Sequence, residues 1–473
     1  TSHEQFTKML SRRQLLKTSS SGVGYLAFAA LAHEQAIAEK KRQGPLSPKE
    51  PHFVPKAKRV IFLSMRGAPS HVDMFDYKPQ LSKDNGKPGK FGRGRGGKLL
   101  GSPWEFKQHG KSGLWISELT PEIASHADEL CLLRGMHTDL PNHPQAQTMM
   151  HTGSSQFVRP SIGAWTLYGL GTDNADLPGF VALGAPNGNA NHFASGFLPA
   201  IYQGARFSGN SRRVGGNNRF ARRESKPNIP NIANPKLDRD LQRLQLDYVQ
   251  SLNKTKLGRD KHAPGVEGVI ESLELGFRMQ DTLPELMDTS GESKKTLELY
   301  GIGSGGNDNF GKQCLLARRF VESGVRFVEL SHGNWDHHRN LTNDLAARCN
   351  EIDRPIAGLL TDLKRRDMLK DTLVVWAGEF GRTPHGQGGD GRDHNNKGYT
   401  TWMAGGGVKG GMSYGSTDEY GYEAVDGRMH IHDWHATILH LLGLDHEKLT
   451  YNHAGRDFRL TDVHGVVAKD IIS

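Results

Sequence analysis

Cysteine is scarce in this sequence. The 473 residues contain three cysteines, Cys131, Cys314 and Cys349, an odd number with no short spacing between them. This argues against a disulfide framework and against a zinc site built from thiolates. Long hydrophobic runs are also missing, since the apolar run at residues 21–32 is far shorter than the roughly 20 residues that span a bilayer comfortably. We therefore expect no stable membrane span and a fold that relies on packing.

The first 38 residues are organised like an export signal. Arg12 and Arg13 precede the weakly apolar run, and Ala36-Ile37-Ala38 supplies the small-residue pattern that a signal peptidase accepts. We interpret residues 1–38 as a twin-arginine signal peptide, which implies the twin-arginine translocase as a partner and a periplasmic or extracellular location. An ordinary amphipathic terminal helix and an uncleaved membrane tether are the alternatives. Because this pathway exports folded proteins, often with a metal already loaded, a metal site is worth seeking.

The charge balance is mildly basic. The net charge of +9 suits an anionic substrate, such as a sulfated or phosphorylated polymer, although solubility would explain it equally well. The Arg-rich stretch at 206–223 could bind nucleic acid or an anionic polymer, and the Gly-Arg run at 92–97 could imitate a phosphate loop. Neither lies between a predicted strand and a predicted helix, which is the context that a phosphate loop requires. We interpret both as solvated loops and expect no nucleic-acid partner.

Short apolar runs alternate with helical patterns along most of the chain. Residues 39–58 are rich in Lys and Pro and resemble a linker. Residues 314–323 and 352–366 repeat apolar side chains at helical spacing, and each leads into a strand-like run. This alternation predicts an α/β domain over 59–473, with a mostly parallel central sheet and helices on both faces. The polar range 205–300 breaks the rhythm and is expected to be a helical, Arg-rich insertion. The predicted strands are 59–64, 130–133, 180–183, 325–330, 373–376 and 401–404.

Histidine and carboxylate side chains follow several predicted strands. Ligands of an open α/β sheet bind beyond the carboxyl ends of its strands, so these side chains are candidates for a shared site. A mixed set of His and carboxylate ligands can hold zinc, manganese or iron, whereas Ca²⁺ and Mg²⁺ prefer oxygen ligands. We expect a divalent ion here, zinc or another transition metal. The candidate ligands are His71, Asp73, Asp336, His337, Glu379, Asp393, His394 and His432, and His338 lies in the same cluster; His435 and His440 are assigned to a packing helix at 434–442.

Two segments resemble parts of the alkaline phosphatase and sulfatase superfamily. The run from Ile352 to Gly381 is similar to a helix–strand unit that ends in a metal-binding pair in that superfamily. Glu379 takes the Asp place of the pair, and Phe380 takes the His or Asn place and cannot ligate a metal. Residues 143–153 are similar to the sulfatase segment that carries the nucleophile, which places Asn142 at the nucleophile position.

The whole mature chain resembles the DUF1501 family of exported proteins. The resemblance spans roughly residues 59–465 and implies an alkaline phosphatase-like, sulfatase-like sandwich. The segments that carry it are residues 67–76, 378–384, 391–394, 404–411, 432–437 and 455–463.

The sequence departs from the superfamily where the chemistry should lie. The first strand is followed by Met65-Arg66-Gly67 in place of a metal-binding Asp, and Asn142 has no atom that can attack sulfur or phosphorus. Ordinary sulfatase chemistry is therefore not expected. Hydrolysis by metal-activated water is expected instead. In this hypothesis His143 or His394 transfers protons, and an anionic group is held by Arg66, Arg382 or Lys397.

These observations favour an exported, metal-dependent hydrolase of sulfate or phosphate esters on an extracellular anionic substrate, a small molecule or a polysaccharide. Asn142 and Phe380 favour the alternative, a non-catalytic carbohydrate-binding or assembly protein that keeps the fold. A metal-dependent isomerase or transferase is a third interpretation, because fold does not fix reaction. The hydrolase hypothesis requires that the candidate ligands converge at one edge of the sheet.

Overall fold

The computed structural model describes residues 44–89, 97–186, 190–207, 232, 236–260, 264–303, 305 and 308–473. The expected signal peptide at 1–38 and most of the Arg-rich stretch lie outside these residues. Within the part of the chain that is described, none of the helices is both long and apolar enough to cross a membrane.

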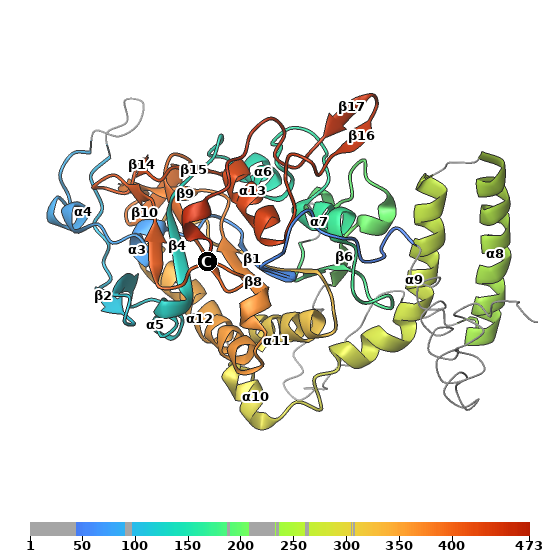
Figure 1. Cartoon of the computed structure of the whole chain (residues 1–473). Helices are drawn as coiled ribbons and strands as arrows, with labels where there is room; N and C mark the ends of the chain where they lie inside the picture. The colour runs from blue at the N-terminus through green and yellow to red at the C-terminus, as the bar shows by residue number, and fades with distance from the viewer. Residues whose placement is uncertain are drawn as a thin grey trace, which may run out of the picture.

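A mixed, mostly parallel sheet forms the centre of the molecule (Figure 1). Strand β1 (Arg59–Met65) lies between β7 (Phe327–His332) and β8 (Thr372–Ala377) and runs parallel to both. β5 (Phe180–Leu183) and β6 (Ala205–Phe207) extend the parallel part beyond β7. The six predicted strands are all present, and the strand order is β12-β4-β11-β8-β1-β7-β5-β6.

One strand runs against the others. β11 (Tyr399–Ala404) is antiparallel to both of its neighbours, β8 and β4 (Leu130–His137). Two short strands, β12 (Met412–Tyr414) and β15 (Met429–His430), pair in parallel with β4. The carboxyl ends of β1, β7 and β8 therefore meet at one edge of the sheet, where the loops after them carry the candidate ligands.

Apolar side chains cover both faces of the sheet, because the central strands are buried on both sides. Alternate residues of β1 point into two separate cores. Leu63 packs with α11 (Asp308–Glu322) and α12 (Leu341–Arg365), and Phe62 packs with helices of the opposite face. Those helices are α6 (His143–Thr152), α7 (Ile162–Leu170) and α13 (Ile431–Leu441). The prediction of helices on both faces is confirmed.

Some helices are longer than predicted. α12 begins at Leu341, eleven residues before its predicted start, because Leu341, Leu345 and Cys349 continue its buried stripe at four-residue spacing. α13 begins at Ile431 because His430 and Asp433 form a capping box at its N-terminus.

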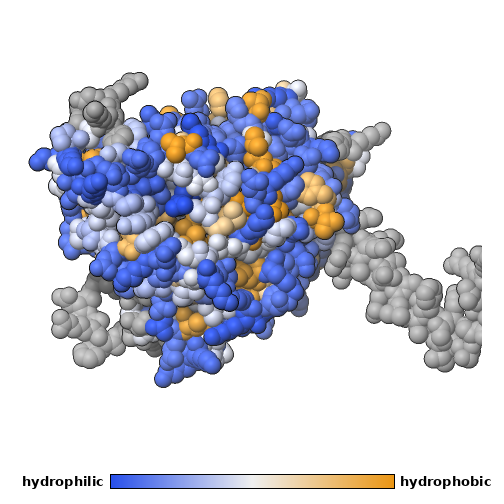
Figure 2. All heavy atoms as spheres, turned by 60° about the vertical axis from the view of Figure 1, so that its left-hand side comes forward, coloured by the Kyte–Doolittle hydropathy of each residue, from blue (hydrophilic) through white to orange (hydrophobic). Residues whose placement is uncertain are grey.

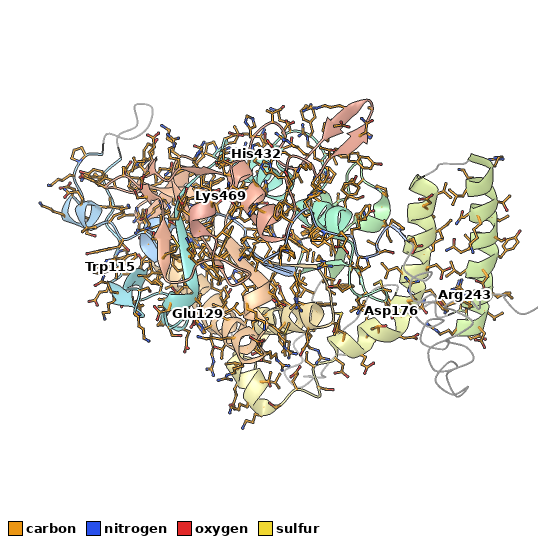
Figure 3. All side chains as sticks on the ribbon, viewed as in Figure 1. Trp115, Glu129, Asp176, Arg243, His432 and Lys469 are labelled. Carbon is orange, nitrogen blue, oxygen red and sulfur yellow. The ribbon has the colours of Figure 1, made fainter. Side chains whose placement is uncertain are left out.

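Two long helices, α8 (Arg239–Asp260) and α9 (Pro264–Met287), lie side by side at one end of the molecule, away from the centre of the sheet (Figure 1). Arg243 of α8, labelled in Figure 3, binds Glu274 of α9 through two nitrogens at 2.8 and 2.9 Å. Because β6 at 205–207 belongs to the sheet, the first residues of the range expected to be an insertion are part of the core fold.

The remaining elements are short. The face in Figure 2 is largely hydrophilic, with scattered apolar side chains. The short helices are α3 (His71–Met74), α4 (Pro79–Lys83), α5 (Pro121–Ala124) and α10 (Lys294–Leu299). Four strand pairs outside the main sheet are β2 (Phe106–His109) with β3 (Leu114–Ser117), β9 (Gly381–Gln387) with β10 (Gly391–Asn395), β13 (Ser416–Thr417) with β14 (Ala424–Asp426), and β16 (Tyr451–His453) with β17 (Arg456–Phe458).

Candidate metal centre

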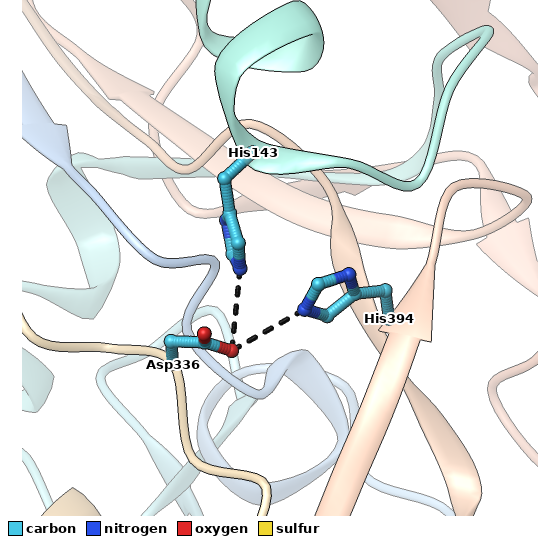
Figure 4. A group of neighbouring side chains, drawn as sticks. All are labelled: His143, Asp336 and His394. Atoms are coloured by element: carbon cyan, nitrogen blue, oxygen red, sulfur yellow. Dashed lines mark hydrogen bonds and ion pairs between the residues drawn. The ribbon is translucent and has the colours of Figure 1, made fainter.

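Three segments that are far apart in the sequence bring polar side chains together beyond the carboxyl edge of the sheet (Figure 4). The segment after β7 carries Asp336 and His338, and β10 carries His394. His143 is the first residue of α6, which begins there because the Asn142 side chain caps it and Pro144 occupies the first turn. Within the described residues, the sets that could hold a metal ion are His143, Asp336 and His394, and His338, Asp393 and His394.

One carboxylate oxygen is the centre of the group. Oδ1 of Asp336 lies 2.9 Å from Nε2 of His338, 3.2 Å from Nε2 of His143 and 3.3 Å from Nε2 of His394. The Nε2 atoms of His338 and His394 are themselves 2.9 Å apart. Three imidazole nitrogens thus lie around one carboxylate oxygen.

The other nitrogen of each ring faces a hydrogen-bond acceptor. Nδ1 of His143 lies 2.6 Å from Oε1 of Glu379, and Nδ1 of His394 lies 2.7 Å from the carbonyl oxygen of Pro141. Nδ1 of His338 contacts Oε1 of Gln387. Because these oxygens only accept hydrogen bonds, each Nδ1 carries a proton. The three Nε2 atoms face Oδ1 of Asp336, to which His143 and His394 donate hydrogen bonds, and a metal ion bound here would take the place of those protons.

Electrostatics hold the cluster in a charged state. Burial opposes ionisation of Asp336, but hydrogen bonds from His143, His394 and Arg382 outweigh it and keep the pKa of Asp336 far below its ordinary value. Burial likewise lowers the pKa of His143, yet Asp336 and Glu379 on either side raise it to about 9. A divalent cation bound by this cluster would therefore displace a proton from His143.

Solvent reaches the cluster. The side chain of Asp336 is 42% exposed and that of His338 is 33% exposed, whereas His143 and His394 are about one-fifth exposed. An ion held here would be accessible to water and to a small anionic group.

Several predicted site residues lie around this cluster. Glu379 is buried behind His143, and Asp393 accepts a hydrogen bond from the backbone N–H of His394 at 2.8 Å. The buried guanidinium of Arg382 donates to Asp336 at 2.7 Å and to the carbonyl oxygen of Ala68 at 2.9 Å. Since its three nitrogens all bond to protein atoms, Arg382 orients Asp336 and is not free to hold an anion.

Four predicted ligands are not brought together with Asp336. His71 is buried and bonds to the carbonyl oxygen of Gly421 at 2.8 Å. Asp73 accepts two hydrogen bonds from Arg392, at 2.7 and 3.0 Å, in an ion pair with no exposed side-chain surface. His432 (Figure 3) bonds to the carbonyl oxygen of Gly153 at 3.0 Å.

The fourth, His337, is buried, and its neighbour His338 supplies the nitrogen that faces Asp336. The two-residue spacing from Asp336 to His338 is a signal that could have identified His338, because alternate side chains of an extended segment point the same way. Gln147 was also missed; it lies one turn after His143 on α6 and donates to Glu379 at 3.0 Å.

The remaining predicted residues have different surroundings. Asn142 is the N-cap of α6 and its amide also bonds to Gln145. Nζ of Lys397 lies 5.2 Å from the centre of the Tyr422 ring. Arg66 is half-buried directly after β1, and among the described residues its Nε atom has no hydrogen-bond partner and no carboxylate pairs with it.

A mixed sheet covered by helices on both faces, with a histidine and carboxylate cluster at its carboxyl edge, defines an α/β protein with a candidate metal centre. The family model described as "Protein of unknown function (DUF1501)" matches residues 57–472, so the chain belongs to the DUF1501 family. None of the curated proteins matches the chain significantly.

Several solved structures are similar to this chain at low sequence identity. The C-terminal periplasmic domain of EcEptC from Escherichia coli, in complex with Zn, is 8% identical with a TM-score of 0.38, covering 90% of this chain and 99% of that one. The PsFucS1 sulfatase from Pseudoalteromonas sp. is 13% identical with a TM-score of 0.32, covering 87% and 70%. The phosphonate monoester hydrolase SpPMH from Silicibacter pomeroyi is 10% identical with a TM-score of 0.34, covering 82% and 73%.

Proposed function

We propose that this protein is a metal-dependent hydrolase of sulfate or phosphate esters. The observation that carries the proposal is the convergence of three imidazole nitrogens on Oδ1 of Asp336, with the outer nitrogen of each ring held by an acceptor. Such a donor set suits zinc or another transition metal. The ligands would be His143, His338, His394 and Asp336, with Asp393 beside them.

When bound, a divalent ion supplies a Lewis acid and a water molecule of lowered pKa. The protein's own residues would bind and orient the ester. Arg66 offers a guanidinium without a carboxylate partner among the described residues, at the carboxyl end of the central strand. Asn142 caps α6 and has no nucleophilic atom, so water attacks the ester directly, without a covalent intermediate at this position.

The basic net charge of the chain supports an anionic substrate, and a sulfated or phosphorylated polysaccharide fits it. Export by the twin-arginine pathway would place the protein with such polymers. Fusion of residues 1–38 to a reporter tests this part of the proposal: replacement of Arg12 and Arg13 by Lys should keep the reporter inside the cell, and unchanged export would contradict it.

The decisive experiment combines metal analysis with hydrolysis of 4-nitrophenyl phosphate and 4-nitrophenyl sulfate. The expected result is stoichiometric metal, with hydrolysis lost after chelation and in Asp336→Asn. Asp139→Asn is the matched control, because Asp139 is also a half-exposed carboxylate that contacts a histidine, His430 at 3.1 Å, but lies outside the cluster. A folded wild-type protein that binds no metal and hydrolyses neither ester would contradict the proposal.

A non-catalytic polysaccharide-binding protein is the second candidate. It is favoured by Asn142, whose side chain caps a helix, and by Phe380, whose ring is buried and cannot ligate a metal. Retention on an immobilised sulfated polysaccharide, by a metal-loaded protein that hydrolyses neither ester, would support this candidate over the hydrolase.

A further inference from the structure

The buried carboxylate of Glu379 lies directly behind His143. Oε1 faces Nδ1 of His143 at 2.6 Å and accepts from Nε2 of Gln147 at 3.0 Å and from the backbone N–H of Gly67 at 3.0 Å. Oε2 is 3.2 Å from the same backbone nitrogen. The side chain has no exposed surface. Glu379 is therefore fixed from three directions and faces the ring of His143 on the side opposite to Asp336.

We propose that Glu379 is a positioning residue that raises the metal affinity of the cluster through His143 and does not bind the ion itself. This inference rests on the metal centre of the proposed function. A carboxylate that accepts a hydrogen bond from the outer nitrogen of a metal-binding histidine fixes the ring orientation and increases the basicity of the inner nitrogen. The contact with Nδ1 of His143 has this geometry.

The turn after β1 connects Glu379 to the segment that carries Asp336. The backbone N–H of Gly67 donates to Glu379, and its carbonyl oxygen accepts from Arg382, which also donates to Asp336. Gly67 has a φ of +109°, and a Cβ there would lie 2.7 Å from the backbone nitrogen of Asp336. Only glycine fits this position. One backbone turn thus holds the two side chains that orient His143 and Asp336.

The same helix offers a matched control. Glu329 is a second buried glutamate that pairs with a histidine of α6, since its Oε1 lies 2.9 Å from Nε2 of His151. Both glutamate side chains are at most 1% exposed. His151 lies two helical turns beyond His143 and contacts none of the proposed ligands in the described structure. Glu329→Gln therefore disturbs a comparable buried pair away from the cluster.

The experiment measures zinc affinity of the full chain by competition with a chromophoric chelator, together with the absorption spectrum of the cobalt-substituted protein. Glu379→Gln should weaken zinc binding by about 10- to 100-fold and shift the cobalt spectrum. Glu329→Gln should leave both unchanged. Unfolding of the metal-free variants is measured alongside, because loss of either buried pair also lowers stability.

Zinc binding that is unchanged in Glu379→Gln, or weakened equally in both variants, would overturn the inference while leaving the proposed function intact. A wild-type protein without zinc affinity would overturn both. If Glu379→Gln does not fold, Gln147→Ala decides, because it removes one donor to Glu379 and keeps the carboxylate in place. Weaker zinc binding in Gln147→Ala supports the inference, and unchanged binding overturns it.

Discussion

Two adjacent histidines offer a direct test of the metal centre. His338 faces Asp336 and His394, whereas His337 is buried on a different side of the same segment. Replacement of each by phenylalanine keeps a ring of similar size and removes the nitrogens. The substitution should therefore weaken metal binding at His338 and leave it unchanged at His337.

The expected magnitudes follow from the surroundings. Loss of a group that only orients a ligand costs about 10- to 100-fold in metal affinity, so loss of the ligand in His338→Phe should cost more than that. Burial, with a smaller effect of the Arg382 charge, lowers the pKa of His337 to about 4, so this ring is neutral at pH 7. Neither nitrogen of His337 has a hydrogen-bond partner among the described residues. His337→Phe should therefore leave zinc affinity unchanged and stability equal or slightly higher.

Zinc titration against a competing chelator and urea unfolding of the metal-free proteins provide the two measurements. Affinity that is retained in His338→Phe and lost in His337→Phe would refute the assignment of the cluster. Equal loss in both variants, with lower unfolding midpoints, would show that the segment merely needs its native structure.

Three further predictions concern residues around the cluster. Asp73→Asn leaves Arg392 buried without its charged partner, so the unfolding free energy should fall by about 3–5 kcal/mol in urea unfolding. The zinc affinity of this variant should not change. Loss of zinc binding with unchanged stability would show that Asp73 is a metal ligand after all. Burial lowers the pKa of His435 to about 3, so the unfolded chain takes up a proton that the folded chain excludes. The unfolding free energy should fall as the pH drops from about 6.5 toward 3. His435→Gln should reduce the slope of unfolding free energy against pH by about 1.4 kcal/mol per pH unit. An unchanged slope in this variant would show that His435 does not cause the pH dependence. Arg66→Gln removes a hydrogen bond to the charged ester, so the KM measured by steady-state kinetics should rise by about 10- to 100-fold. Zinc affinity should stay unchanged. A fall in kcat with an unchanged KM would contradict this prediction.

Much of the fold could be predicted from the sequence because it is encoded locally. The apolar run at 180–183 coincides with β5, and β1 and β8 begin and end within one residue of the predicted runs. A strand buried on both faces must be apolar throughout, so its own residues identify it. The direction of β11 could not be predicted, because an apolar run has the same composition in either direction.

The candidate site was predictable in part. Asp336, Asp393 and His394 follow recognisable strands or turns, and parallel strands bring their carboxyl ends together. Their partners depend on contacts across the chain: Arg392 lies 319 residues from Asp73, and Glu379 lies 236 residues from His143. The sequence by itself determined the elements and the edge of the sheet at which polar side chains gather. Only the tertiary structure decided which of these side chains face one another. The periodicity of apolar residues depends on neighbours along the chain, whereas the binding partner of a carboxylate depends on which distant hydrogen-bond donors packing brings to it.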